Sequence, residues 1–409
     1  MGLWKNHLIE IESRGYGDSD KFICSAHIND AFISEKIRYS HNNGKCSFCG
    51  KYRNVLPFND ILKLIADYIN YDYLPADGNA IYDSEEKEYI EPVIDPYDFV
   101  YDELNSYLLI EDEVVLKELF DKLSFEDRVS PYRIKLRERQ EDLDLEAWDE
   151  YCRLVKSCPF SAEQIVSISD KEESTEIVEA IRGMLDYVWG YCKDQYLVKT
   201  IYGLSSQYRA HRYYRCVNYL PMYGKNKPEY AGLSFIPATL VGTAPAKLVK
   251  DNRMSEAGDM MFYGADDKKT AMIEVGFGGA NPITMGTFCS NKRFRILDLS
   301  EISKWKCPSI FDIEKVERRS TWFFLREFME RISEEKVDDD SYKPTQVFTK
   351  YIQRKTDLQG IKYKSSKTGK GCYVIFVVNR DCLDPDDKRE PKRNQLIMEK
   401  VEQLLYEEN

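Results

Sequence analysis

The chain has 409 residues, of which 43% are hydrophobic and 31% charged, and its formal net charge is −12. This length allows two or three domains, and the acidity argues against a protein whose main task is to coat nucleic acid. No apolar run approaches the roughly 18 residues that a membrane span needs. The N-terminus lacks a secretory pattern, and eleven cysteines, an odd number, indicate a reducing cytoplasm.

Composition and periodicity divide the chain into three parts. Residues 1–58 contain a cluster of cysteine and histidine, residues 59–197 are acidic and helical in pattern, and residues 198–409 mix strand and helix patterns. We therefore predict an α+β protein with a zinc-binding module over 1–58, a helical region over 59–197 and a mixed domain over 198–409 that carries the chemistry.

The first part contains two closely spaced pairs of metal-ligand residues. Cys24-x2-His27 is followed by Cys46-x2-Cys49. Two-residue spacing lets both members of a pair approach one ion from a tight turn, and two such pairs form a tetrahedral zinc site. Four protein ligands leave no position for water, so this zinc would be structural. The alternative is a set of buried cysteines with a surface histidine nearby.

The helical region has apolar residues at helical spacing. The clearest stripe comprises Ile177, Ile181, Met184, Leu185 and Val188. Asp170 and Glu173 ahead of it suit a helix start. Similar patterns predict a helix that follows Asn59 and helices over 114–123 and 143–155. Residues 71–101 are rich in Asp, Pro and Tyr, which predicts a long loop or a linker.

After about residue 200 the pattern changes to short runs of β-branched and aromatic residues bounded by Gly, Pro, Asp and Asn. We expect strands at these runs, which span 260–265, 270–277, 282–288, 294–299 and 372–378. Helices are predicted over 319–335, 345–355 and 396–408.

Three blocks in this part carry groups that suit chemistry on a nucleotide. They span 207–212, 253–275 and 360–377, and they supply arginine, tyrosine, glutamate and serine. Arginine offers a fork of donors for pyrophosphate, and an aromatic ring offers a face for nicotinamide. A carboxylate stabilises the positive charge that develops when a glycosidic bond breaks. Glu274 lies between Ile273 and Val275, and a charge inside such a strand must face a cleft or a partner.

Together these blocks resemble the RES domain, a family of the ADP-ribosyltransferase-like superfamily whose members act on NAD. Two flanking segments, 297–300 and 344–346, match it as well, and the resemblance covers roughly residues 200–380. It implies a split β-sheet domain, in which two small sheets clasp a cleft that holds NAD. The Cys-rich helical half resembles more weakly the HEPN-like regions that precede some RES domains. It lacks the Arg-x4–6-His motif of the HEPN ribonucleases.

The resemblance also implies roles for single residues. Glu274 would be the catalytic carboxylate. Arg209, with Arg212 as the alternative, would contact NAD, and Arg253 would contact phosphate or hold its loop. Tyr263 would stack on nicotinamide, and Ser365, with Ser366 as the alternative, would fix the ribose or the carboxamide. Without the resemblance, the tyrosine would be a core residue, the serine a turn residue, and the charged residues would lie on the surface.

The function that the resemblance implies is cleavage of NAD to nicotinamide and an ADP-ribose product, with water or phosphate as acceptor. Such an NAD glycohydrolase or phosphorylase would act as a bacterial, cytoplasmic toxin or defence effector. An antitoxin or the N-terminal half would restrain it. One alternative is a protein ADP-ribosyltransferase with the same NAD site. Another is a non-enzymatic zinc adaptor that binds a nucleotide. A homo-oligomer stays an open alternative, and we expect no membrane partner.

Overall fold

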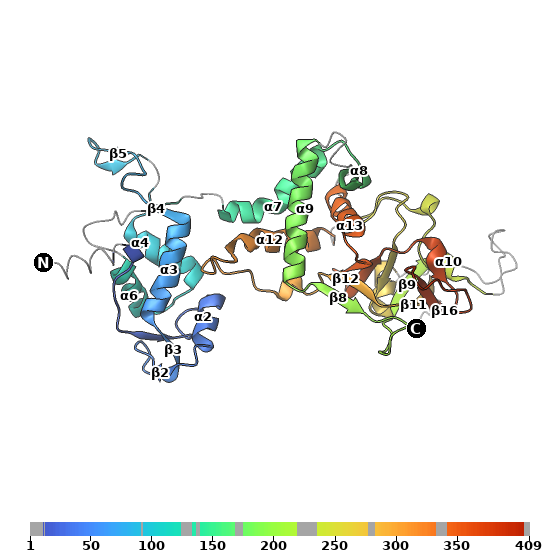
Figure 1. The fold of residues 1–409 in the computed structure, drawn as a ribbon, viewed down its shortest axis with the longest axis horizontal. Coiled ribbons are helices and arrows are strands. Elements are labelled where there is room, and N and C mark those ends of the chain that lie inside the picture. The colour runs from blue at the N-terminus through green and yellow to red at the C-terminus, as the bar shows by residue number, and fades with distance from the viewer. Residues whose placement is uncertain are drawn as a thin grey trace. The chain divides into compact units, whose positions relative to one another are not determined.

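The computed structural model describes residues 11, 13–90, 93–123, 133–135, 140–167, 175–218, 235–276, 283–332 and 342–404. The chain divides into two compact units. The first comprises Met1–Leu145 and Lys306–Trp322, and the second comprises Glu146–Trp305 and Phe323–Asn409. Figure 1 shows the elements of each unit. Within the described ranges, we find no helix long and apolar enough to cross a membrane.

The first unit packs helices around a small antiparallel sheet. The sheet has the order β1–β3–β2, formed by Phe22–Cys24, Tyr52–Pro57 and Asn43–Lys45. The main helices are α2 (Ala31–Arg38), α3 (Phe58–Asp72) and α6 (Glu113–Leu123). The predicted apolar face of α3 is confirmed, because its residues at helical spacing are buried: Ile61, Leu62, Ile65 and Ile69. The predicted helix over 114–123 is confirmed as α6.

The segment over 71–101 is not the long loop that its composition predicts. It contains the strand β4 (Tyr73–Pro75), a hairpin of β5 (Tyr82–Asp83) with β6 (Glu88–Tyr89), and the short helix α4 (Pro96–Asp98). Asp95 starts α4, since its side chain accepts hydrogen bonds from the backbone N–H groups of two helical residues. Aromatic rings of the 71–101 segment pack against one another. The ring of Tyr73 packs edge-on against that of Phe99, with 4.9 Å between the ring centroids.

Five helices lie wholly or for the larger part in the second unit. They are α7 (Gln140–Ser157), α8 (Ala162–Ser167), α9 (Glu176–Asp194), α12 (Arg319–Arg331) and α13 (Lys343–Lys355). Helix α9 is the long green helix of Figure 1. Three members of its predicted stripe, Ile181, Leu185 and Val188, are buried, whereas Ile177 and Met184 are half-buried. The expected capping pair, Asp170 and Glu173, lies outside the described residues. The predicted helices over 143–155, 319–335 and 345–355 are confirmed, apart from residues 333–335, which are not described.

The second unit is built on one nine-stranded sheet of order β15–β16–β11–β9–β10–β14–β13–β12–β8. Parallel pairs occur at β12–β13 and β15–β16, and the other neighbours are antiparallel. The expected two small sheets are therefore joined in a single continuous sheet. In chain order the strands are Val198–Ile201, Tyr213–Asn218, Phe262–Ala265, Ile283–Ser290, Phe294–Asp298, Gly360–Lys364, Gly371–Ile375, Cys382–Leu383 and Leu396–Leu404. Four of the five predicted strands are confirmed, as β10, β11, β12 and β14.

The predicted C-terminal helix over 396–408 is wrong. Residues Leu396–Leu404 form strand β16, which pairs along the whole of β11. The three consecutive apolar residues that begin it, Leu396, Ile397 and Met398, are all buried in this pairing. Tertiary packing against a fully buried strand overrides the local helical pattern. Residues 405–408 are outside the described part.

Candidate active site

Glu274 is not in a strand, as the sequence pattern predicts, but is the last residue of helix α11 (Lys268–Glu274). Asp267 starts this helix, because its side chain accepts a hydrogen bond of 2.9 Å from the backbone N–H of Thr270. A capping aspartate ahead of a lysine pair favours a helix over a strand. Glu274 is exposed, and Gly276, with a φ of 75°, ends the turn that follows.

Ser365 lies directly against Glu274. Its Oγ donates a hydrogen bond of 2.5 Å to Glu274 Oε1 and accepts one of 3.1 Å from the backbone N–H of Thr368. Ser365 is only 3% exposed, because it begins a tight turn after β13 in which Gly369 takes a φ of 69°. Ser366 is exposed. The geometry thus favours Ser365 over its neighbour as the residue that orients the glutamate.

Four of the predicted site residues line one cavity of about 340 Å³. These are Arg253, Tyr263, Glu274 and Ser365, and the other lining residues are Asn252, Met254, Ile332, Tyr342, Tyr363, Lys364 and Ser366. The walls combine two tyrosine rings of the sheet with a guanidinium, a carboxylate and hydroxyls. The lining residues come from separate places between residues 252 and 366, which is why no short motif describes the site.

Tyr263 is fixed at both ends. Its ring belongs to β10, and its hydroxyl donates to Asn252 Oδ1 and lies 3.1 Å from Ser255 Oγ. Burial raises the pKa of Tyr263 to about 12, so the hydroxyl stays protonated at neutral pH. Arg253 donates from Nη1 to the Ile332 carbonyl at 2.6 Å. Within the described residues its Nε and Nη2 donors have no partner.

Arg209 does not line this cavity. It lies in a separate cavity of about 420 Å³ together with His211, Arg212 and Asp266. Arg212, the alternative, forms an ion pair with Glu399, with 2.8 Å between Nε and Oε2. The sequence block that contains both arginines therefore lies near the sheet, but neither arginine lines a cavity that Glu274 also lines.

Arg215 is the arginine that the sequence reasoning passed over. It lies in β9, and its guanidinium donates to the carbonyls of Val241, Gly242 and Tyr263 at 2.8–3.0 Å. Arg215 also lines a second cavity, of about 230 Å³, together with Glu274, Tyr263 and Tyr363. Burial lowers its pKa, but a guanidinium remains charged at neutral pH. A lone arginine within a strand of otherwise uncharged residues was the signal that could have identified it.

The predicted metal ligands meet in the first unit. The candidate ligand atoms of Cys24, His27, Cys46 and Cys49 all lie within 4.8 Å of one another, and the Cys24 and Cys49 sulfurs are 3.8 Å apart. Zinc–sulfur bonds of about 2.3 Å at a tetrahedral centre give roughly this separation between sulfurs.

The contacts of the two ring nitrogens of His27 suit a metal ligand. Nδ1 of His27 lies 3.1 Å from the Asp112 carboxylate, and the buried Nε2 has no hydrogen-bond partner among the described residues. A carboxylate on one ring nitrogen commonly orients the other toward a metal. The four residues could therefore hold a metal ion, and Asp112 is a supporting residue that spacing alone did not indicate.

Two family models match the chain, in separate ranges. The RES domain model matches residues 226–394, and the model of the HEPN/RES N-terminal domain 1 matches residues 39–167. The RES match contains Arg253, Tyr263, Glu274 and Ser365, and both predicted resemblances are confirmed. No curated protein matches the chain in sequence.

Among solved structures, the chain is similar to one from the M. tuberculosis MbcT–MbcA toxin–antitoxin complex. The identity is 14%, the TM-score is 0.28, and the match covers 54% of this chain and 94% of that one.

Proposed function

We propose that this chain, in which a RES domain follows a HEPN/RES N-terminal domain, cleaves NAD at the bond between nicotinamide and ribose. The observation that carries the proposal is the hydrogen bond of 2.5 Å between Ser365 Oγ and Glu274 Oε1. It lies in a cavity whose walls also hold Arg253 and Tyr263. A carboxylate held in place beside a cation and an aromatic ring suits a substrate that combines ribose, pyrophosphate and nicotinamide.

The reaction divides into bond breaking and capture. As the bond between ribose C1′ and the nicotinamide nitrogen breaks, its electron pair goes to that nitrogen, and nicotinamide leaves as a neutral molecule. The ribose gains oxocarbenium character, which the Glu274 carboxylate stabilises. Because Ser365 donates its hydrogen bond to Oε1 of Glu274, the other carboxylate oxygen, Oε2, would accept a hydrogen bond from a ribose hydroxyl. An oxygen of water or phosphate then attacks C1′ and loses a proton, which gives ADP-ribose or its 1-phosphate.

The arginines would act on the pyrophosphate and on the cavity wall. Arg253 offers two donors with no partner among the described residues, which suits a phosphate oxygen. Arg215 binds the Tyr263 carbonyl at 2.8 Å and so fixes the strand that presents the tyrosine ring. We propose a more distant role for Arg209, at the far end of NAD, because its cavity shares Tyr214 with the one that Arg215 lines.

The remaining parts of the proposal concern the metal and the biological role. We propose that the four-residue Cys/His cluster holds a structural zinc that stabilises the first unit, since four protein ligands leave no position for substrate. We also propose that the chain acts as a bacterial toxin or defence effector in the cytoplasm. A separate inhibitory protein, or the chain's own N-terminal half, would restrain it.

The test is nicotinamide release from NAD by the purified full-length chain. We expect Glu274→Gln to lower kcat by roughly 100-fold or more, because it removes the charge that stabilises the transition state. The matched control is Glu390→Gln, which neutralises a glutamate that is 63% exposed and does not line the cavity. Equal rates for wild type and Glu274→Gln would refute the assignment of this carboxylate.

Two further readouts separate the alternatives. Transfer of label from adenylate-labelled NAD to a protein band would favour protein ADP-ribosylation over release of a free product. NAD binding by calorimetry with no nicotinamide release would favour a nucleotide-binding adaptor. A comparison of buffers with and without phosphate distinguishes phosphorolysis from hydrolysis.

A further inference from the structure

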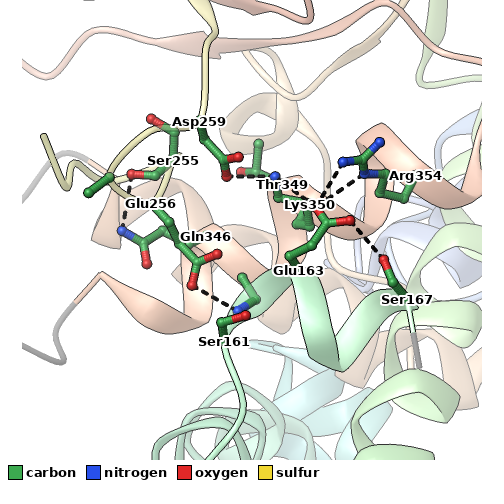
Figure 2. A network of polar contacts seen from close by, with 12 residues as sticks. Ser161, Glu163, Ser167, Ser255, Glu256, Asp259, Gln346, Thr349, Lys350 and Arg354 are labelled. Atoms are coloured by element: carbon green, nitrogen blue, oxygen red, sulfur yellow. Dashed lines mark hydrogen bonds and ion pairs between the residues drawn. The ribbon is translucent and has the colours of Figure 1, made fainter. Parts of the chain in front are cut away.

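A buried lysine connects the candidate site to the helices around it. The side chain of Lys350, in α13, is 2% exposed. Its Nζ lies 2.5 Å from Asp259 Oδ2 and 3.2 Å from Glu163 Oε2. Figure 2 shows this lysine between α8 and the segment that carries Asp259. Burying a charge costs free energy unless the charge is paired and hydrogen-bonded. A hydrophobic residue of similar size would occupy this position without that desolvation cost.

On one side, the network holds the segment 252–259, here called the site loop. Two residues of the site loop, Asn252 and Arg253, line the cavity of Glu274. Helix α13 binds the loop at two further points. Thr345 Oγ1 donates to the Arg253 carbonyl, and Gln346 Nε2 donates to the Asn252 carbonyl at 2.8 Å and to that of Ser255 at 3.2 Å. Lys350 thus fixes the far end of a loop whose near end forms the cavity wall.

On the other side, the network holds helix α8. Glu163 accepts hydrogen bonds from Ser167 Oγ at 2.8 Å and Arg354 Nη2 at 3.0 Å. Burial raises the pKa of the Glu163 carboxyl, but the hydrogen bonds from Ser167, Arg354 and Lys350 outweigh it and bring the pKa below its ordinary value. The site loop also caps this helix, because Glu256 Oε1 accepts a hydrogen bond of 2.8 Å from the backbone N–H of Ala162.

The two ends of this network belong to different family matches. Helix α8 lies at the end of the HEPN/RES N-terminal match, whereas Asp259 and Lys350 lie in the RES match. The site loop therefore contacts the last helix of the N-terminal match directly through Glu256 and Ala162. It contacts this helix indirectly through Lys350, which pairs with both Asp259 and Glu163. A change in the position of α8 would act on the loop by both routes.

We propose that Lys350 is a positioning residue for the NAD site, and that helix α8 regulates this site through it. The lysine is shared between Asp259 of the site loop and Glu163 of α8, so the helix sets how firmly the loop presents Arg253. This proposal rests on the proposed function for its substrate, though not for the mechanical link. Displacement of α8 would loosen the loop and weaken binding of the NAD pyrophosphate, with little effect on the chemistry at Glu274.

The test uses full-length protein with Asp259→Asn, Glu163→Gln and the double variant. We expect Asp259→Asn to raise KM for NAD roughly 10-fold with kcat within about twofold, since only binding geometry changes. Glu163→Gln should raise KM in the same direction, by roughly threefold. Because both act through one lysine, the rise in KM of the double variant over wild type should be smaller than the product of the two single rises, roughly 30-fold. Glu150→Gln, which neutralises an exposed ion pair with Arg153 on α7, is the matched control.

Hydrogen–deuterium exchange supplies a readout that needs no catalysis. We expect faster exchange in peptides covering 252–259 in both single variants, and unchanged exchange in β11 and β16. Unchanged exchange in the site loop, or equally faster exchange across the whole sheet, would overturn the proposal. If the wild type releases no nicotinamide, the proposed function fails, while the exchange comparison still decides whether Lys350 positions the loop. A rise in KM of the double variant equal to the product of the two single rises would also overturn the proposal that both residues act through Lys350.

Discussion

Asp266 ties three parts of the sheet together and should stabilise the second unit in a pH-dependent way. It follows β10, and its Oδ1 accepts a hydrogen bond of 2.5 Å from Tyr373 Oη and lies 3.3 Å from His211 Nε2. Its Oδ2 lies 3.1 Å from Lys362 Nζ. Burial raises the pKa of this carboxyl, but the contacts with His211, Tyr373 and Lys362 outweigh it and lower the pKa from 3.8 to about 2.

The size of the effect follows from this difference. A folded-state pKa of about 2 against an ordinary value of 3.8 corresponds to about 2 kcal/mol of stability. Because the folded pKa is the lower one, the contribution is complete above about pH 5 and disappears as the pH falls toward 2. We therefore expect Asp266→Asn to destabilise the second unit by about 2 kcal/mol at pH 7, and by progressively less below pH 4.

Urea unfolding at pH 7, 5, 4 and 3, followed by exchange in peptides of β10 and β14, measures this contribution within the unit that contains it. Asp357→Asn is the control, since that carboxylate is 68% exposed in its pair with Arg295 and such surface pairs contribute roughly 0–1 kcal/mol. A destabilisation by Asp266→Asn that stays the same from pH 7 to pH 3 would refute the electrostatic reasoning and leave only a packing effect.

Three other predictions concern the site, the metal cluster and the sheet. Ser365→Ala should lower kcat for nicotinamide release roughly 10- to 100-fold, as expected for loss of a hydrogen bond to a charged group; an unchanged kcat would mean that Glu274 needs no orientation. Cys46→Ser should remove zinc from the purified protein, measured by elemental analysis, and a chelator should lower the Tm of wild type but not of the variant. Gly360→Ala should lower the unfolding free energy by about 1–3 kcal/mol, because its Cβ would lie 2.3 Å from the Val374 carbonyl oxygen. A Tm equal to that of wild type would contradict this last expectation.

The parts of the fold that could be predicted from sequence are those where one local pattern decides the structure. Helices α3 and α9 each carry a full apolar stripe over several turns, so their burial follows from spacing. The four metal-ligand residues lie together, as their spacing predicts. Each pair is held by its own tight turn, so only one long-range contact, between the two pairs, is needed to form the cluster. Each of these predictions depends on few partners.

The parts that could not be predicted depend on neighbours that are distant in sequence. Residues 396–404 form a strand because β11 is available to pair with them, and nothing local indicates that pairing. Glu274 occupies a helix because Asp267 caps the turn before it, so the alternation of Ile273 and Val275 around it was misleading. Arg215 reaches the site only because β9 lies beside β10, while the arginines in the loop before β9 stay outside it.

The return of Lys306–Trp322 to the first unit has a consequence for cutting the chain into pieces. Phe311 from this segment is 1% exposed and packs edge-on against Tyr68 of α3, with 5.3 Å between ring centroids. A fragment that starts at residue 146 or 226 carries this segment away from the core it fills and leaves its aromatic and aliphatic side chains exposed. The matching N-terminal fragment lacks part of its own interior. To separate the units, both residues 1–145 and residues 306–322 would have to be removed from the second unit. If the N-terminal half restrains the site, toxicity measured on forms with a single truncation would combine loss of that restraint with loss of folding.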